Sequence, residues 1–323
     1  MKCLIFFVFL NLTTILARAE GGFLFVTFHD ETSPLSEQIY FAISQDGYNW
    51  QALNDDRPVL VSNVGERAVR DAYILRSHDG SHFYILATDL SFFHNQNWHR
   101  NTHQGSKSIV VWDSSDLIHW SNARLVPVAP RDAGCAWAPE AIWDDETHDY
   151  LVFWASTTGS DNFVRQRIWA CHTSDFATFG IPFIYMQKTQ DLIDADIVRS
   201  SGKYYRFSKD DTHKAISMEV SDKLSGPWEN VPTFSLAQLA GYEAPECFQI
   251  SPATTNKPAT WCLLLDHYGN HSGYAPFVAS DLATGRFIPG TGFHFPYPFR
   301  HGAVLPVSDQ ELILLKTAFK GKS

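Results

Sequence analysis

Three acidic residues, each at the start of a short apolar segment, are the strongest candidates for chemistry in this sequence. They are Asp71, Asp194 and Glu243. Two carboxyl groups that flank a bond can act as general base and general acid, and hydrolysis of a glycosidic bond needs such a pair. Because the segments that carry the three acids recur along the chain, we predict that the acids occupy equivalent positions of a repeat and meet around one pocket.

Three further acids in the same segments compete for the same roles. Asp196 follows Asp194 by two residues, so strand alternation places both on one face and does not separate them. Glu246 lies three positions after Glu243 and is expected to face the other way. Glu140, near Trp137, is a candidate for a structural or substrate-contacting acid.

The segments that carry these acids form a series that we interpret as the innermost strands of a repeated sheet. Four of them are followed by a second predicted strand, at 83–87, 150–154, 204–208 and 261–265. Most of the segments start with polar residues, and all of them run into an apolar strand. The five segments are Arg70 to Leu75, Trp137 to Ile142, Ile193 to Val198, Glu243 to Phe248 and Arg300 to Leu305.

A second series interleaves with the first. A Ser-Asp turn followed by an aromatic residue recurs five times, and each copy follows an apolar or alternating strand, as expected between the two outer strands of a propeller blade. The aspartates of these turns are Asp46, Asp116, Asp175, Asp222 and Asp281.

The fifth inner segment lacks a second strand because Ser308 to Glu311 has the pattern of a helix capping box and begins a short final helix. Segments 23–28 and 39–43, and the segment after Trp50, can supply the missing strands from the other end of the chain. The sequence therefore predicts an all-β, five-bladed propeller over residues 20–323, closed by its two ends so that no sheet edge is left open.

The N-terminus and the charge set the expected location and partners. Residues 1–19 have a basic start, a short apolar run and a small-residue cleavage pattern, so we expect a signal peptide and a secreted, extracellular, monomeric product. No later stretch approaches the roughly 20 apolar residues that cross a bilayer. A net charge of -10 without basic clusters argues against nucleic acid and membrane surfaces as partners. The expected partner is a carbohydrate substrate.

Four cysteines remain after residue 19. An even number in an exported chain permits two disulfides, and Cys247 and Cys262, which flank a predicted hairpin, are the favoured pair. The alternative is that all four, with Cys135 and Cys171, are small buried apolar residues.

With these segments in this order along the chain, the sequence resembles glycoside hydrolase family 43. Members of that family are five-bladed propellers and include α-L-arabinofuranosidases and β-D-xylosidases. The resemblance covers nearly all of the chain after residue 19. The motifs that carry it are Arg70-Asp71-Ala72, Trp137-Ala138-Pro139-Glu140, Ile193-Asp194-Ala195, Glu243-Ala244-Pro245 and Arg300-His301-Gly302.

The resemblance implies an inverting glycoside hydrolase that acts on a plant-type polysaccharide or oligosaccharide. Asp71 would be the general base, Asp194 the acid that orients and tunes its partner, and Glu243 the general acid. Ala72, Ala195 and Ala244 stand where the family often has Pro or Gly. These departures leave the chemistry in place and weaken the inference of substrate.

The candidates for substrate contact are Trp137, Glu140, Tyr73 and His301. The resemblance implies neither an obligatory cofactor nor a catalytic metal ion. It leaves open a structural calcium ion in the central channel, where some relatives hold calcium or water and where His301 is expected to lie.

Two other functions fit parts of the pattern. A retaining fructosidase of the related five-bladed group would explain Arg70-Asp71 and Glu246-Cys247, but residues 28–31 lack its Asn-Asp-Pro nucleophile motif. A non-catalytic carbohydrate-binding propeller is the second alternative, and the presence of all three acids argues against it. The sequence does not determine the sugar or the linkage.

Overall fold

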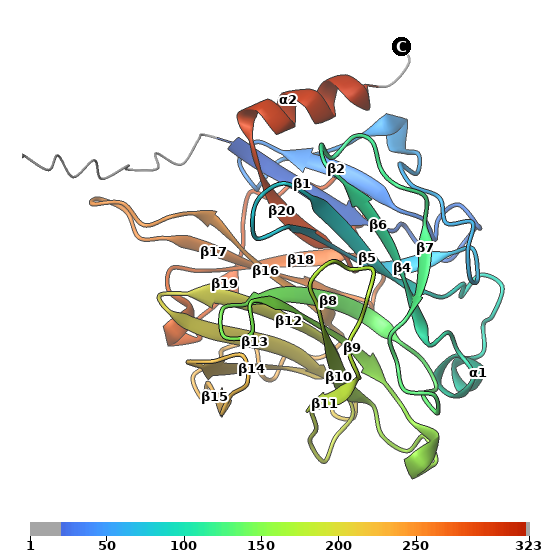
Figure 1. The fold of residues 1–323 in the computed structure, drawn as a ribbon. Coiled ribbons are helices and arrows are strands. Elements are labelled where there is room, and N and C mark those ends of the chain that lie inside the picture. Colours follow the sequence, from blue (N-terminus) through green and yellow to red (C-terminus); the bar gives the residue numbers. More distant parts are fainter. Residues whose placement is uncertain (1–20, 321–323) are drawn as a thin grey trace, which may run out of the picture.

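The computed structural model describes residues 21–320, and the predicted signal peptide lies outside this range. Five four-stranded antiparallel sheets form the blades of a β-propeller (Figure 1). Each sheet is ordered from the channel outwards, and the innermost strands of neighbouring blades contact one another. The predicted five-bladed, all-β fold is therefore confirmed.

The first blade closes the ring from both ends of the chain. Its innermost strand comes from the C-terminus and lies antiparallel to β1, with Leu24 opposite Leu305 (Figure 1). This arrangement removes the exposed edge that an open ring would leave. The strands of blade 1 are β20 (Ala303–Ser308), β1 (Gly21–Thr27), β2 (Tyr40–Ser44) and β3 (Trp50–Ala52).

The other four blades follow in chain order, and the four predicted second strands fall within β5, β9, β13 and β17. Blade 2 consists of β4 (Val69–Arg76), β5 (Phe83–Asp89), β6 (Ser108–Ser114) and β7 (Arg124–Pro127). Blade 3 consists of β8 (Trp137–Asp144), β9 (Asp149–Ser156), β10 (Arg167–Thr173) and β11 (Phe183–Met186). Blade 4 consists of β12 (Leu192–Ser200), β13 (Lys203–Asp210), β14 (Ala215–Ser221) and β15 (Glu229–Asn230). Blade 5 consists of β16 (Glu243–Ser251), β17 (Thr260–Asp266), β18 (Tyr274–Ala279) and β19 (Ile288–Pro289).

Few helical elements accompany the sheets. The C-terminal helix α2 (Asp309–Ala318) begins with the predicted capping box, in which Ser308 and Glu311 bond each other's backbone N–H groups. A second helix, α1 (Trp98–His103), lies in the segment between β5 and β6. Three short 3₁₀ turns are η1 (Asn54–Asp56), η2 (Gly159–Asp161) and η3 (Leu282–Thr284). In residues 21–320 no helix is both long and apolar enough to span a bilayer.

The Ser-Asp turns connect the third and fourth strands of the blades, as predicted. In blade 1 the Asp46 carboxylate accepts hydrogen bonds from the backbone N–H groups of Tyr48 and Asn49, both at 2.8 Å. Asp116 does the same for Ile118 and His119. These local bonds hold the corner without help from another blade, which explains why the turn is readable from sequence.

The hydrophobic core is divided into five clusters, one between each pair of neighbouring blades. This division shows why the favoured disulfide is wrong. Cys262 pairs in register with Phe248, so Cys247 on the adjacent position points to the opposite face of blade 5. Cys247 lies in the cluster between blades 4 and 5, and Cys262 in the cluster between blades 5 and 1. All four described cysteines are buried free thiols.

Candidate functional site

A shared irregularity at the start of four innermost strands positions the candidate acids. In blade 5, Glu243 pairs with Asp266 and Glu246 pairs with Leu264, so the two residues of β16 between these pairs oppose a single residue of β17. The same extra residue occurs in β4, β8 and β12. Such a bulge lets one residue adopt positive φ. The residues with positive φ at these bulges are Asp71 (51°), Ala138 (48°), Asp194 (50°) and Ala244 (51°).

The bulge corrects one prediction about side-chain direction and one about which positions of the repeat are equivalent. Because Asp266 and Leu264 are two residues apart, their partners Glu243 and Glu246 lie on the same face, and the prediction from parity was wrong. The three acids also do not occupy equivalent positions. The residue of blade 5 that matches Asp71 and Asp194 is Ala244, and Glu243 is one position earlier.

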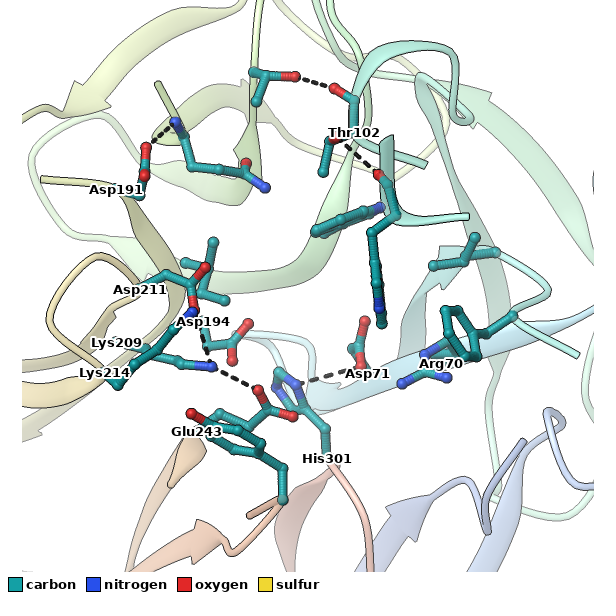
Figure 2. A pocket seen from close by; sticks show the side chains of 18 of the residues that line it. Arg70, Asp71, Thr102, Asp191, Asp194, Lys209, Asp211, Lys214, Glu243 and His301 are labelled. Carbon is teal, nitrogen blue, oxygen red and sulfur yellow. Dashed lines mark hydrogen bonds and ion pairs between the residues drawn. The ribbon is translucent and has the colours of Figure 1, made fainter. Parts of the chain in front are cut away.

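The three acids nevertheless meet in one pocket of about 690 Å³ at the mouth of the channel (Figure 2). Figure 2 shows Asp71 and Arg70 on one side of His301, and Glu243 and Lys209 on the other. Trp137 also lines this pocket. Three blades thus contribute the acids and a fourth contributes His301, the geometry that the hypothesis of a shared site required.

Asp71 is held as a carboxylate by two neighbours. Its Oδ1 lies 3.4 Å from Nδ1 of His301, and its Oδ2 accepts a hydrogen bond from Thr88 Oγ1 at 2.8 Å. Burial alone would raise the pKa of Asp71, but the charge and hydrogen bond of His301, with Arg70 and Thr88, lower it to about 2. Burial opposes protonation of His301, but the Asp71 charge raises its pKa to about 9. The two groups form an ion pair at neutral pH.

Gly302 allows His301 to reach this position. A Cβ atom at Gly302 would lie 2.0 Å from the carbonyl oxygen of Val26, so only glycine fits against β1 here. The Tyr274 hydroxyl is 3.1 Å from both the N and the O of Gly302, and Thr27 Oγ1 donates to the carbonyl of Arg300 at 2.6 Å. The Arg300-His301-Gly302 motif is therefore fixed by its neighbours in blades 5 and 1.

Asp194 and Glu243 share a more crowded environment around Lys209. Lys209 Nζ lies 2.8 Å from Glu243 Oε2, 3.1 Å from Asp211 Oδ1 and 4.2 Å from the Tyr268 ring centre. The pKa of Lys209 is raised because its carboxylate neighbours outweigh its burial. Burial and the charge of Glu243 raise the pKa of Asp194 to about 7, and its Oδ2 accepts a hydrogen bond from the Ala244 backbone at 3.1 Å.

Sequence reasoning missed several residues of this pocket. Lys209 lies opposite Ile193, next to Asp194, and its place at the end of a second strand was a usable signal. Glu31, on the loop after β1, contacts Arg70 at 2.7 Å and Arg300 at 3.4 Å. Its position gave no local signal, because the contact depends on closure of the ring.

Two predicted substrate contacts lie elsewhere. Neither Glu140 nor Tyr73 lines the pocket that holds the three acids. Tyr73 lines a second cavity of about 470 Å³, formed by later residues of the inner strands, with Asp196 and Glu246. Asp194 and Asp196 are therefore separated by their positions along the strand. Asp194 lines the pocket of the three acids, and Asp196 lies deeper in the channel.

A second group of carboxylates occupies that deeper level. Ligand oxygens of Glu140, Asp196 and Glu246 all lie within 4.8 Å of one another, and all three residues are buried. Among the described residues, Glu140 Oε2 has no hydrogen-bond partner. Burial and mutual repulsion raise the pKa values of Glu140 and Glu246 well above normal, and burial raises that of Asp196 to about 7. Oxygen donors of this kind fit a hard cation such as Ca²⁺.

The chain is similar to known glycoside hydrolases in sequence and in fold. The α-L-arabinofuranosidase of Bifidobacterium longum subsp. longum is 28% identical over 64% of this chain, and this chain spans only 22% of that relative. A thermostable family-43 glycoside hydrolase matches with a TM-score of 0.54 and 15% identity, over 78% of this chain and 82% of its own. An endo-1,4-beta-xylanase from Bacteroides thetaiotaomicron matches with a TM-score of 0.53 and 13% identity, over 80% and 85%.

At these identities the two solved structures show the shared propeller fold. The sequence model of a family described as "Probable glycosyl hydrolase domain" matches residues 19–312, nearly all of the chain. Together with the five blades and the carboxylates around one pocket, this match establishes that the chain belongs to the glycosyl hydrolase 43-related family.

Proposed function

We propose that this protein is a glycoside hydrolase that acts by inversion on a plant-type polysaccharide or oligosaccharide, as an α-L-arabinofuranosidase or a β-D-xylosidase. The observation that carries the proposal is the convergence of Asp71, Asp194 and Glu243, from three blades, on one pocket. Inversion needs a carboxylate that activates water on one face of the sugar and an acid that protonates the leaving oxygen on the other.

Asp71 is the general base in this mechanism. Its ion pair with His301 and the depressed pKa keep it ionised at neutral pH, so it can accept a proton from water. The Thr88 hydroxyl donates to the other oxygen and fixes the plane of the carboxylate. The same hydroxyl accepts a hydrogen bond from the Ala138 backbone at 2.7 Å, which ties its position to blade 3.

Glu243 is the general acid, and Lys209 and Asp194 lie beside it. The pKa of Asp194 is raised to about 7, so Asp194 can carry a proton near neutral pH. Lys209 also contacts Asp211, so movement of its ammonium group towards Asp211 would release Glu243 Oε2 from its ion pair and let Glu243 act as the proton donor. The proton then passes from Glu243 to the leaving oxygen.

The choice of sugar is tested by a screen of purified protein. The B. longum relative is named an α-L-arabinofuranosidase, and that name supports the first of the two sugars. We expect hydrolysis of aryl α-L-arabinofuranoside or aryl β-D-xyloside and weaker or no hydrolysis of β-D-galactoside. Proton NMR of the first product should show the inverted anomer. Turnover of galactoside alone would refute the proposed sugars, and a retained anomer would refute inversion and favour the fructosidase-like mechanism.

We further propose that Glu140, Asp196 and Glu246 hold a structural calcium ion that is not required for catalysis. Such an ion would let three buried carboxyl groups ionise together, whereas without it their charges would repel one another. Calcium should raise the melting temperature of metal-free protein by several degrees, since ligand binding to the folded state stabilises it.

Glu246→Gln provides the matched variant for the calcium proposal. Glutamine keeps an oxygen for the Val304 N–H that now bonds Glu246 at 2.8 Å, but it removes one charge. The calcium-induced shift in melting temperature should shrink or vanish in this variant. An equal calcium shift in the wild type and in Glu246→Gln would contradict this assignment.

A further inference from the structure

The segment between β5 and β6 forms a fixed wall of the pocket. Asn97 caps α1 by accepting a hydrogen bond from the Arg100 backbone at 3.1 Å, and Arg100 pairs with Glu66 of blade 2. The fully buried Asn101 donates to the carbonyl of Asn95 at 2.8 Å. Thr157 of blade 3 donates to the carbonyl of Thr102. These contacts hold α1 against two blades.

This segment exposes Trp98 to solvent, with two other aromatic side chains packed against it. Trp98 is 52% exposed and lines the same pocket as the three acids. Phe92 stacks on it at 4.4 Å between ring centres, and Trp137 contacts it edge-on at 5.9 Å. Single exposed apolar residues are common on protein surfaces, so exposure alone carries no meaning. Trp98 differs because rigid neighbours hold it at the opening of a pocket that already contains the acids.

The pocket extends well beyond the acids. Thr102 and Asp191 lie at the opposite end of the pocket from Glu243 and His301 (Figure 2). Six apolar residues of the lining come from blades 2 and 3 and the loops beside them, and we call this group the apolar wall. They are Leu90, Phe92, Trp98, Trp137, Phe163 and Val164.

The charges of the pocket favour a neutral ligand along that wall. Arg70 is paired with Glu31, and Arg300 with Asp266 at 2.8 Å. On the opposite rim Lys214 is paired with Asp211 at 2.7 Å. Because these cations are already neutralised, the pocket offers little attraction for an anionic sugar. A neutral sugar ring, with an apolar face and hydroxyl groups at its edge, matches an aromatic wall that faces a polar rim.

We propose that Trp98, backed by Phe92 and Trp137, is a binding platform for a second, neutral sugar unit next to the unit that is cleaved. The proposal rests on the proposed function and narrows it, because it makes the substrate an oligosaccharide or polysaccharide chain. Trp98 thereby determines preference for chain length and takes no part in bond cleavage.

The test measures binding separately from turnover, in the Glu243→Gln background. Xylotriose, arabinotriose and galactotriose, and the matching methyl monosaccharides, are titrated by calorimetry with and without Trp98→Ala. Loss of a stacked aromatic contact should weaken trisaccharide binding about three- to tenfold and change monosaccharide binding less than twofold. Trp98→Phe should recover part of the trisaccharide affinity.

Phe183→Ala is the matched control, since Phe183 is a 40% exposed aromatic residue on β11 that does not line the pocket. It should leave the affinity for every sugar unchanged. The platform is refuted if none of the trisaccharides binds, if Trp98→Ala leaves their affinity unchanged, or if it weakens both lengths equally. Failure of the proposed hydrolysis is a separate result, because it would appear as absence of turnover by the wild type while Trp98-dependent binding persists.

Discussion

Replacing Asp71 with Asn should lower kcat/KM by about 10²–10⁴ on every substrate that the wild type hydrolyses. Asparagine has the shape of aspartate and can still accept the hydrogen bond from Thr88, but it cannot take a proton from water. The loss should be the same for substrates with good and poor leaving groups, because Asp71 acts on the attacking water and not on the leaving oxygen. Steady-state kinetics with a series of aryl glycosides measures it.

Asp113→Asn is the control for this prediction. Asp113 is an aspartate of β6 in the same blade, pairs with Arg124 at 3.2 Å and does not line the pocket. Its replacement should leave kcat/KM unchanged. Retention of more than about a tenth of the wild-type activity by Asp71→Asn would remove Asp71 from the role of base.

Replacing Glu243 with Gln should produce a loss that depends on the leaving group. Glutamine cannot donate the proton that a sugar or alcohol leaving group needs, so kcat/KM on natural oligosaccharides should fall by about 10²–10⁴. Aryl glycosides with an acidic phenol need little protonation and should lose much less. The measurement is the slope of log(kcat/KM) against the pKa of the leaving phenol, which should steepen in the variant.

Glu146→Gln is the matched control for Glu243. Glu146 also pairs with a lysine, Lys223, but at an exposed position away from the pocket. It should leave the slope unchanged. A uniform loss across leaving groups in Glu243→Gln would argue against general-acid catalysis by Glu243, and a steepened slope in Asp71→Asn would exchange the two roles.

The pair of predictions separates the two carboxylates by the physics of their surroundings. Asp71 faces the cations His301 and Arg70 and stays ionised. Glu243 pairs with the Lys209 ammonium group and lies beside the buried carboxyl group of Asp194. The pKa of Asp194 is raised to about 7. The pKa values of Asp71 and Asp194 are thus moved in opposite directions, and such pairs of titratable groups are a common basis for acid and base assignments. Here both environments come from neighbouring blades.

The residues of the repeat determined most of the fold. Ser-Asp turns such as the one at Asp46 are stabilised by hydrogen bonds within a few residues, and the apolar segments alternate within a single strand. Both signals are local, so they can be read from sequence. Closure of the ring followed from counting, since one inner segment lacked partners that residues 23–28 and 39–43 could supply, and β20 pairs with β1 as expected.

The identity of the pocket residues was only partly readable. The motifs placed Asp71, Asp194, Glu243, Trp137 and His301 correctly in one pocket. Glu140 and Tyr73 belong to the same motifs, but lie outside its lining. The depth of a side chain in the channel depends on how the blades assemble, which the alternation of residues along one strand does not show.

The tertiary structure alone decided which acid faces which environment. One extra residue in each of four innermost strands is a property of pairing with a neighbouring strand, and it reversed the parity expected for Glu246. Contacts between distant segments, such as Lys209 with Glu243 and Glu31 with Arg70, likewise exist only once the blades are assembled. The sequence by itself thus determined the five blades and the kinds of residue at their axis, because those depend on short-range pattern. The charge and position of each group in the pocket depend on burial and long-range pairing, which the folded ring supplies.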